Sequence, residues 1–313
     1  MKVFVTGGAG FIGSHLVERL LALNNNVTIY DNFSSGRKSF LSNVLHNKRL
    51  KIVEVDVLEF RKLKNEIKDH DIVYHLCANP DVRKGTLDTR LDLEQETIAT
   101  YNVLEAMRQS GVTKIVFPSS MTVYGRAKGV VSEDYGPCLP ISLYAAGKLA
   151  CEGMISAYCA TFGLQAWIFR FANIVGGQAT HGVIYDLIHK LLKDRKTLEV
   201  LGDGKQDKPY IHIDDALPAM EFVVSHAKDR VNLFNVGNSD TIRVSEIAKI
   251  VTSKMRLKNI KINYTDTPYG WKGDVVQFRL DIRKLTQLGF VPQYSSRQSI
   301  ERTVEELLRE LGL

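Results

Sequence analysis

The stretch Lys2–Gly13, which reads KVFVTGGAGFIG, decides the fold of this 313-residue chain. A short apolar run leads directly into a loop that carries Gly7, Gly10 and Gly13, and the apolar spacing of a helix continues over Ile12–Leu23. Glycine suits such a loop because a Cβ would obstruct the tight turn, the approach of a pyrophosphate or the packing of helix on strand. The N-terminus of the helix then offers free N–H groups and a partial positive charge to phosphates. The alternative is a glycine-rich turn that binds no ligand.

The first half of the chain alternates short apolar runs with longer helical patterns. Compact apolar runs are typical of strands that are covered on both faces. The predicted strands are Lys2–Thr6, Val27–Tyr30, Lys51–Val55, Ile72–Leu76, Lys114–Phe117 and Ala166–Phe171, and the predicted helices are Ile12–Leu23, Ile98–Met107 and Tyr144–Tyr158. This alternation predicts an α/β fold with a Rossmann-type, doubly wound parallel sheet and right-handed crossovers.

The regularity fades after about Ile174. Helical patterns continue at Val183–Lys193, Asp215–Val224, Val244–Val251 and Gln298–Leu311, and loops that contain glycine and proline join them. A further strand, Asn232–Val236, is expected to return to the main sheet. We therefore predict a Rossmann domain over residues 1–173, to which 205–237 return, interleaved with a smaller, loop-rich substrate-binding lobe over 174–313.

Composition and charge exclude several classes of protein. The chain is 44% hydrophobic and 24% charged with a formal net charge of +6, which excludes disordered, collagen-like and disulfide-scaffold proteins. No concentrated basic stripe is present, so no nucleic-acid partner is expected. The longest uncharged run contains Gly163 and several polar residues, which argues against a membrane span.

The cysteines and the start of the chain bear on the compartment. The four cysteines show no CxxC spacing and no clustering with histidine, so we expect reduced thiols and no metal site: Cys77, Cys138, Cys151 and Cys159. A strand begins directly after Met1, which leaves no room for a signal peptide. A cytoplasmic protein is the expectation.

An acidic residue follows the second predicted strand, where Asp31 precedes Asn32. A carboxylate there can accept hydrogen bonds from both hydroxyls of a ribose and would repel a 2′-phosphate, which predicts NAD rather than NADP. Arg37 would favour NADP, but Asp31 is better placed. Asp56 and Val57 follow the third strand, where a carboxylate can meet the amino group of adenine and an apolar side chain its ring. Strand, loop, helix and acid stand in the order of an NAD site.

Tyr144 and Lys148 form a YxxxK pair. Residues four apart share one face of a helix, so the ammonium group is expected near the phenol. A unit charge ~4 Å from a phenolate, at an effective dielectric constant of ~20, stabilises it by ~4 kcal/mol. This interaction would lower a pKa of ~10 by up to ~3 units, before desolvation takes part of the shift back. A phenol poised near neutral pH is a usable general base, although YxxxK also occurs by chance as packing plus a surface lysine.

Together, these motifs resemble those of the extended short-chain dehydrogenases/reductases, and most closely the UDP-galactose (UDP-glucose) 4-epimerase group. The resemblance covers nearly the whole chain in family order: Gly7–Gly13, Asp31–Asn32, Ser119–Gly125, Tyr144–Lys148, Arg170–Gly176, Leu201–Gln206, Tyr210–Asp215, Phe234–Gly237 and Gly270–Val275.

The resemblance implies roles for individual residues. Tyr144 would be the base, Lys148 would hold the ribose and tune Tyr144, and Ser120 would bond the sugar O4. Asn173 would contact the nucleotide diphosphate, although Ser120 as a strand cap and Asn173 as a turn residue are the alternatives. The expected cofactor contacts are Gly7, Gly10, Phe11, Ile12, Gly13, Asp31, Asn32, Ser35, Gly36, Asp56, Val57, Leu76, Ala78, Asn79, Tyr144, Lys148 and Phe171, and the expected substrate contacts are Ser120, Tyr144, Asn173, His181, Gly182, Val183 and Lys208.

The residues Met121 and Thr122 bear on the type of reaction. Related 4,6-dehydratases carry an Asp-Glu pair there, and related decarboxylases carry Glu at the second position. Neither side chain in this chain can supply the acid or base of an elimination, so reversible oxidation at C4 is expected. The resemblance then implies a UDP-glucose/UDP-galactose 4-epimerase. The alternatives are a 4-epimerase for UDP-N-acetylhexosamines or uronic acids, or an NAD-sensing protein without turnover.

The chain departs from the family pattern at several positions. Glu96 stands where an asparagine is usual, and its carboxylate either pairs with a cation or faces away. Lys208 and Trp271 stand where relatives often have arginine, which leaves the diphosphate anchor open, with Arg83 and Arg279 as further candidates.

The resemblance also implies a homodimer, formed by pairing the long helices at about Asp92–Gln109 and Ser142–Phe162. The surface of such a dimer would include Ala145, Ala146, Ala150, Ile155 and Ala157, which could equally belong to the core.

Overall fold

The computed structural model describes residues 1–265 and 267–313. The chain divides into two compact units, and each is discontinuous because the chain passes between them several times. The first unit comprises residues 1–123, 142–169 and 223–233, and the second comprises residues 124–141, 170–222 and 234–313. The second unit thus takes in a segment, 124–141, that precedes the predicted boundary at residue 173.

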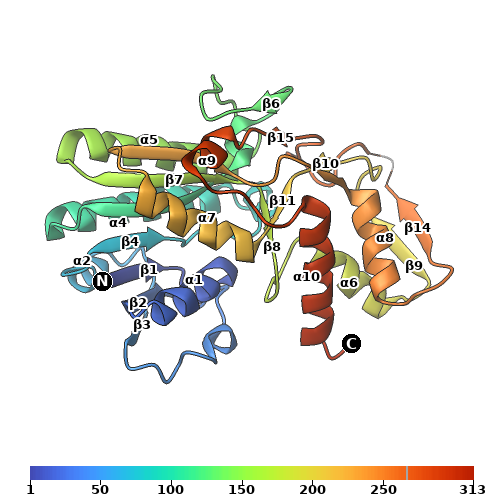
Figure 1. Ribbon diagram of the computed structural model, residues 1–313, viewed down its shortest axis with the longest axis horizontal. Coiled ribbons are helices and arrows are strands. Elements are labelled where there is room, and N and C mark those ends of the chain that lie inside the picture. The colour runs from blue at the N-terminus through green and yellow to red at the C-terminus, as the bar shows by residue number, and fades with distance from the viewer. Residues whose placement is uncertain (266) are drawn as a thin grey trace. The chain divides into compact units, whose positions relative to one another are not determined.

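A seven-stranded sheet has the order β12-β7-β5-β4-β1-β2-β3 (Figure 1). Its strands are β1 (Lys2–Thr6), β2 (Asn26–Asp31), β3 (Leu50–Glu54), β4 (Ile72–His75), β5 (Lys114–Ser120), β7 (Gln165–Phe171) and β12 (Val231–Val236). β1 pairs in parallel with both β2 and β4, and the β2–β3 and β4–β5 pairs are also parallel. The strand order reverses beside β1, so the predicted doubly wound fold is confirmed, and β12 returns to the sheet as expected.

Helices cover this sheet in the first unit. They are α1 (Phe11–Ala22), α2 (Phe60–Glu66), α3 (Thr89–Asp92), α4 (Ala99–Ser110) and α5 (Leu143–Phe162), with shorter turns η1 (Lys38–Leu41), η2 (Lys84–Thr86), η3 (Leu93–Ile98) and η4 (Met121–Tyr124). α2, α4 and α5 pack side by side over a core that includes Phe4, Val103 and Phe117 (Figure 1). Because parallel crossovers are right-handed, the reversal of strand order puts α1 on the opposite face.

Local sequence sets the ends of the two long helices. α4 ends at Gly111 and α5 at Gly163, both with a left-handed backbone that glycine adopts without strain (φ 74° and 76°). α5 begins after Ser142, whose hydroxyl accepts a hydrogen bond from the N–H of Ala145 at 3.2 Å. This cap places Tyr144 in the first turn of α5.

The helical run before α4 is longer than predicted. The sequence pattern predicts a helix from Ile98, whereas helical structure begins at Thr89 and passes through α3 and η3 into α4. The η3 segment is π-helical, with a wider turn than an α-helix. Single π turns inside α-helices are rare and occur often at functional sites.

In its described residues, the second unit is built from two-stranded sheets and helices. Its strands pair as β8 (Asn173–Val175) with β11 (Tyr210–His212), β9 (Thr197–Val200) with β14 (Lys261–Tyr264), β10 (Asp207–Lys208) with β13 (Ile242–Arg243), and β6 (Val130–Val131) with β15 (Arg279–Leu280). Its helices are α6 (Val183–Lys193), α8 (Val244–Lys254), α9 (Arg283–Leu288) and α10 (Ser296–Glu310), while α7 (Ile213–His226) begins in this unit and ends in the first. α8 packs on both α6 and α10, and this cluster buries Ile188, Ile247 and Val304 (Figure 1). Among the described residues, no helix is both long and apolar enough to cross a bilayer.

Candidate active site

The glycine loop between β1 and α1 is tightly packed on two sides and open on a third. A Cβ on Gly7, whose φ is +69°, would lie 2.7 Å from the backbone nitrogen of Cys77, and one on Gly13 would lie 2.1 Å from the Gly7 carbonyl oxygen. A Cβ on Gly10 would meet only the Gly7 oxygen, at 3.4 Å. The open space beside Gly10 is therefore the place where a ligand can approach the backbone.

The N-terminus of α1 is free to bind an anion. Gly10 is the N-cap residue and supplies no side-chain cap, and no acidic residue lies in the first turn. The N–H groups of Phe11, Ile12 and Gly13 therefore have no intrahelical acceptor. This end of the helix suits a pyrophosphate.

The carboxylate of Asp31 lies directly beside the glycine loop. Its two oxygens accept hydrogen bonds from the N–H of Ala9 at 2.9 Å and the N–H of Phe33 at 2.8 Å. Burial raises the pKa of Asp31, while these two hydrogen bonds act to lower it. Because each carboxylate oxygen has two lone pairs, one on each remains for a ribose hydroxyl.

The adenine side of the predicted site follows β2 and β3. The Asn32 side chain donates to an Asp56 carboxylate oxygen at 2.6 Å, and the other Asp56 oxygen accepts from the N–H of Leu58 at 2.8 Å. Val57 between them is buried. In the loop after β2, a Cβ on Gly36 would lie 2.8 Å from the Cβ of Ala9, so the loop that contains Ser35 packs against the glycine loop. These residues fit an NAD molecule.

Further predicted cofactor positions follow β4 and β7. The N–H of Leu76 donates to the Thr6 carbonyl at 3.1 Å, and Ala78 and Asn79 continue the chain. Asn79 is held by two acidic residues, because its N–H donates to Glu96 at 3.1 Å and its side chain to Asp92 at 2.8 Å. Phe171 ends β7 and belongs to the second unit.

Ser120 is the last residue of β5, three residues beyond the predicted end of that strand. Its Oγ accepts hydrogen bonds from the backbone N–H of Thr122 at 3.2 Å and from the Thr122 hydroxyl at 2.9 Å. Both lone pairs of the Ser120 oxygen are thus engaged, and its own proton is left to donate. The neighbouring Ser119 differs, since its hydroxyl donates to the buried Glu152 at 2.5 Å.

Tyr144 and Lys148 lie one turn apart on α5. The Lys148 ammonium nitrogen is 5.6 Å from the centre of the Tyr144 ring and 4.8 Å from that of Phe117. Only 3% of Lys148 is exposed to solvent. The spacing of the motif therefore brings the cation over the Tyr144 ring.

Glu96 is the residue whose place the sequence left undecided. Its Oε2 lies 2.9 Å from the Lys148 ammonium nitrogen, and the residue is 1% exposed. Gly147 makes the close approach possible, because a Cβ there would lie 2.8 Å from the Cβ of Glu96. A carboxylate from η3 thus joins Tyr144 and Lys148, and the only advance signal is an acid where the family pattern has asparagine.

The expected lowering of the Tyr144 pKa is wrong for the chain without its cofactor. Burial raises the pKa of Tyr144 to about 12, against the lowering effect of Lys148. Glu96 and Asp92 add to the increase, because their negative charges oppose that of Lys148. Burial also raises the pKa of Glu96 to about 7, although Lys148 acts to lower it. Lys148 has the predicted sign of effect, but desolvation of the phenolate is larger.

The remaining predicted substrate residues belong to the second unit. Asn173 begins β8, and its side chain donates to the Pro209 carbonyl at 3.1 Å. His181 and Gly182 are exposed, Gly182 is the N-cap residue of α6, and Val183 begins that helix.

The basic residues considered for the diphosphate all have acidic partners. Lys208 pairs with Asp274, and Arg279 pairs with Asp207 at 2.6 Å. In the first unit, Arg83 pairs with its neighbour Asp81 at 2.9 Å.

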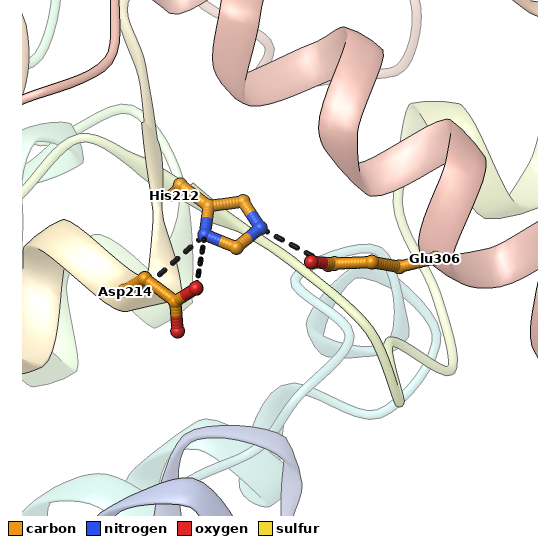
Figure 2. A group of neighbouring side chains, drawn as sticks. All are labelled: His212, Asp214 and Glu306. Atoms are coloured by element: carbon orange, nitrogen blue, oxygen red, sulfur yellow. Dashed lines mark hydrogen bonds and ion pairs between the residues drawn. The ribbon is translucent and has the colours of Figure 1, made fainter.

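Among the described residues, one group of side chains comes close enough together to hold a metal ion: His212, Asp214 and Glu306 (Figure 2). The backbone N–H of Asp214 donates to His212 Nδ1 at 3.2 Å, and His212 Nε2 lies 3.0 Å from Glu306. Arg302 pairs with Asp214 at 2.5 Å and with Glu306 at 3.0 Å. Because these partners already satisfy the polar atoms, the group fastens β11 and the start of α7 to α10.

Comparison with known proteins identifies the family of the chain. The NAD dependent epimerase/dehydratase family matches residues 3–237. A UDP-glucose 4-epimerase of Mycolicibacterium smegmatis is 30% identical over 315 residues, which cover 97% of this chain and 98% of the relative. A UDP-N-acetyl-α-D-glucosaminuronate decarboxylase of Bacillus cytotoxicus is 30% identical over 320 residues, which cover 97% of each chain.

A solved structure of a UDP-galactose 4-epimerase is similar over the full length. It superposes with a TM-score of 0.89 at 38% identity, and the match covers 99% of this chain and 100% of that one. The chain therefore belongs to the NAD dependent epimerase/dehydratase family, and its cofactor is NAD.

Proposed function

We propose that the protein is a UDP-glucose/UDP-galactose 4-epimerase that inverts C4 through a 4-keto intermediate. The observation that carries this proposal is the pairing of Thr122 with Ser120 at the end of β5. Elimination from a 4-keto sugar needs an acid or base beside the sugar. Here the Thr122 hydroxyl donates its hydrogen bond to Ser120, and the Met121 side chain is buried. Reversible oxidation at C4 is the chemistry that remains.

In the proposed mechanism Tyr144 removes the proton of the sugar O4, either directly or through Ser120. Lys148 stabilises the Tyr144 phenolate, which becomes a neutral phenol when it accepts this proton, and the hydroxyl proton of Ser120 orients the O4 atom. NAD, which the glycine loop and Asp31 would hold, would supply a reversible hydride acceptor for C4, so the reaction would involve no net redox change. The 4-keto sugar turns about its bond to the diphosphate and presents its other face, and Tyr144 then returns the proton to O4.

Retention of the nucleotide falls to the second unit in this proposal. Asn173 and the N-terminus of α6 at Val183 offer donors for a diphosphate, with His181 beside them. Lys208 adds a positive charge that Asp274 partly compensates. Firm binding of the nucleotide together with few contacts to the sugar would permit the sugar to turn.

The test is incubation of the purified protein with UDP-galactose, with the sugar product identified by NMR and the bound cofactor by mass spectrometry. The proposal predicts UDP-glucose and bound NAD, with Tyr144→Phe abolishing C4 inversion while NAD remains bound. Unchanged turnover in Tyr144→Phe would reject the mechanism.

Parallel incubations separate the competing functions. Inversion of UDP-N-acetylglucosamine or UDP-glucuronate, without inversion of UDP-galactose, would identify a 4-epimerase for the other sugars. Release of carbon dioxide from UDP-glucuronate would identify a decarboxylase. Bound NAD without turnover of any UDP-sugar would identify an NAD-sensing protein.

We also propose that the protein forms a homodimer through α4 and α5, which lie side by side (Figure 1). Exposed apolar side chains on this surface include Tyr101 and Phe162. Of the small residues considered for it, Ala146, Ala150 and Ala157 are exposed, whereas Ala145 and Ile155 are buried and belong to the core. Sedimentation equilibrium tests the proposal, and a monomer at micromolar concentration would reject it.

A further inference from the structure

Glu96 is held in place by contacts along its whole length. It lies on the π-helical segment η3, and its backbone carbonyl accepts a hydrogen bond from the Cys151 thiol at 3.3 Å. The same thiol also lies 3.1 Å from the Thr100 hydroxyl. Gly147 leaves just enough room for the Glu96 side chain to reach past α5. The position of the carboxylate is therefore built into the packing of η3 on α5.

Both carboxylate oxygens of Glu96 have partners in the site. Oε1 accepts the N–H of Asn79 at 3.1 Å, and Oε2 pairs with Lys148 at 2.9 Å. Two opposite charges this close together, away from water, cancel much of the field that each exerts on a third group. The group in question is Tyr144, whose ring lies 5.6 Å from the Lys148 nitrogen.

Other ionisable groups face the same space from neighbouring elements. His75 of β4 bonds Thr6 at 2.7 Å and Thr100 at 3.0 Å, and burial lowers its pKa to about 3, so it is neutral. Burial raises the pKa of both Cys77 and Cys151 to about 12, so these thiols are neutral as well.

Asp92 is the second acidic group near Lys148. One of its oxygens accepts from Asn79 at 2.8 Å, and burial raises the pKa of this carboxyl. It has no direct contact with Lys148 among the described ion pairs. Glu96 is thus the acidic group in direct contact with the Lys148 cation.

We propose that Glu96 is a positioning residue, which fixes the Lys148 ammonium group and, by opposing its charge, sets how readily Tyr144 gives up its proton. The inference rests on the proposed function, in which Tyr144 is the base and Lys148 its partner. When Glu96 is ionised, Lys148 stabilises the Tyr144 phenolate less. When Glu96 carries a proton, the full charge of Lys148 acts on Tyr144.

The decisive change is Glu96→Gln, which keeps the size and the acceptor for Asn79 but removes the charge. Ionisation of Tyr144 is measured on the NAD-loaded protein by the ultraviolet difference absorbance of tyrosinate. Subtracting the same titration of Tyr144→Phe, made in each background, removes the other tyrosines. The pH dependence of the turnover number for UDP-galactose is measured alongside.

We expect Glu96→Gln to shift the titration of Tyr144 and the acidic limb of the turnover number to lower pH by about one unit. Glu96→Asp keeps the charge and should leave both close to their wild-type positions. Glu94→Gln removes a charge from the same segment, where Glu94 pairs with the exposed Arg90, and should shift neither. Should Glu96→Gln fail to fold, Glu96→Asn removes the same charge with a smaller side chain.

The outcomes separate the inference from the proposed function. An unmoved Tyr144 titration in both neutral variants would overturn the inference, even if the enzyme inverts UDP-galactose normally. A merely structural role for Glu96 would lower activity at every pH without moving the titration. If no UDP-sugar is turned over, the proposed function fails, while the spectroscopic titration still decides the role of Glu96.

Discussion

Two groups of charged side chains, one in each unit, differ in how deeply their charges are buried and in how many partners those charges have. In the first unit, Glu96 and Lys148 pair at 2.9 Å and are only 1% and 3% exposed. In the second unit, Arg302 spans Asp214 and Glu306, and Asp214 is well exposed. The charges of the first group are buried and have few partners, whereas those of the second group are partly exposed and have more.

The pKa values of the carboxyl groups of Glu96 and Glu306 consequently shift in opposite directions. Burial raises the pKa of Glu96 to about 7, because the Lys148 cation and the N–H of Asn79 stabilise the carboxylate less than desolvation destabilises it. Burial also acts to raise the pKa of Glu306, but hydrogen bonds from His212, Arg302 and Gly177 bring it below its ordinary value. A buried carboxyl group whose partners only partly offset its desolvation gains or loses its proton near neutral pH. Groups with such shifted pKa values are typical of sites for acid–base chemistry.

The largest expected effect comes from Lys148→Met. The turnover number for UDP-galactose should fall by about 10²–10⁴-fold, because Tyr144 loses the cation that stabilises its phenolate. The variant also leaves Glu96 buried without a cation, so its loss of stability should grow as the pH rises above about 7. Turnover assays and urea unfolding at two pH values measure both effects. Turnover within tenfold of the wild type would contradict the role assigned to Lys148.

Glu96→Gln should change the pH dependence of stability. The folded pKa of Glu96 lies above its ordinary value of 4.5, so the folded state binds the extra proton and stability falls as the pH rises from 4.5 to about 7. The variant should lack this decline, which is on the order of 3 kcal/mol for a shift of this size. Urea unfolding of both proteins across this range provides the measurement, and parallel curves would show that Glu96 does not titrate in the fold.

Glu306→Gln should change the stability of the protein with the opposite pH dependence and by a smaller amount than Glu96→Gln. Because the folded pKa of Glu306 lies below its ordinary value, its contribution is present above pH 4.5 and is lost as the pH falls through the folded pKa. We expect a loss of about 1 kcal/mol at neutral pH that disappears in acid, with the turnover number unchanged. A loss that persists in acid would mean that packing, and not charge, explains the effect.

The smallest effect should come from Glu94→Gln, which breaks the exposed pair with Arg90 at 2.6 Å. Exposed ion pairs between residues four apart on a helix contribute about 0.3–0.5 kcal/mol. Neither the turnover number nor the pH dependence of stability should change measurably. A large effect would mean that disturbance of η3 itself, and not the charge at residue 96, explains the Glu96 variants.

The sequence predicted the fold and the cofactor well because both depend on local patterns. The alternation of strands and helices in the first half follows from the pattern of apolar runs. The glycine loop with Asp31 indicates NAD, because a carboxylate there can accept hydrogen bonds from both ribose hydroxyls and repels a 2′-phosphate. The strand ends were less accurate, as β5 continues to Ser120. A strand end depends on pairing with its neighbour, which a single sequence does not contain.

The electrostatic state of the site was harder to predict. The spacing of Tyr144 and Lys148 places them together, but the pKa of a phenol depends on how much water surrounds it and on charges that arrive from elsewhere in the chain. All of α4 and all of β5 lie between Glu96 and Lys148 in the sequence, so the partner of Glu96 could not be predicted from spacing. The group of His212, Asp214 and Glu306 was missed for the same reason.

By itself, the sequence determined the parallel sheet, the binding of NAD and the presence of a tyrosine–lysine pair, because each is written in residues close together along the chain. Only the tertiary structure decided that Glu96 faces Lys148 and that burial raises the pKa of Tyr144. Burial and distance through space govern the energy of a charge, and both arise only when distant segments pack against one another.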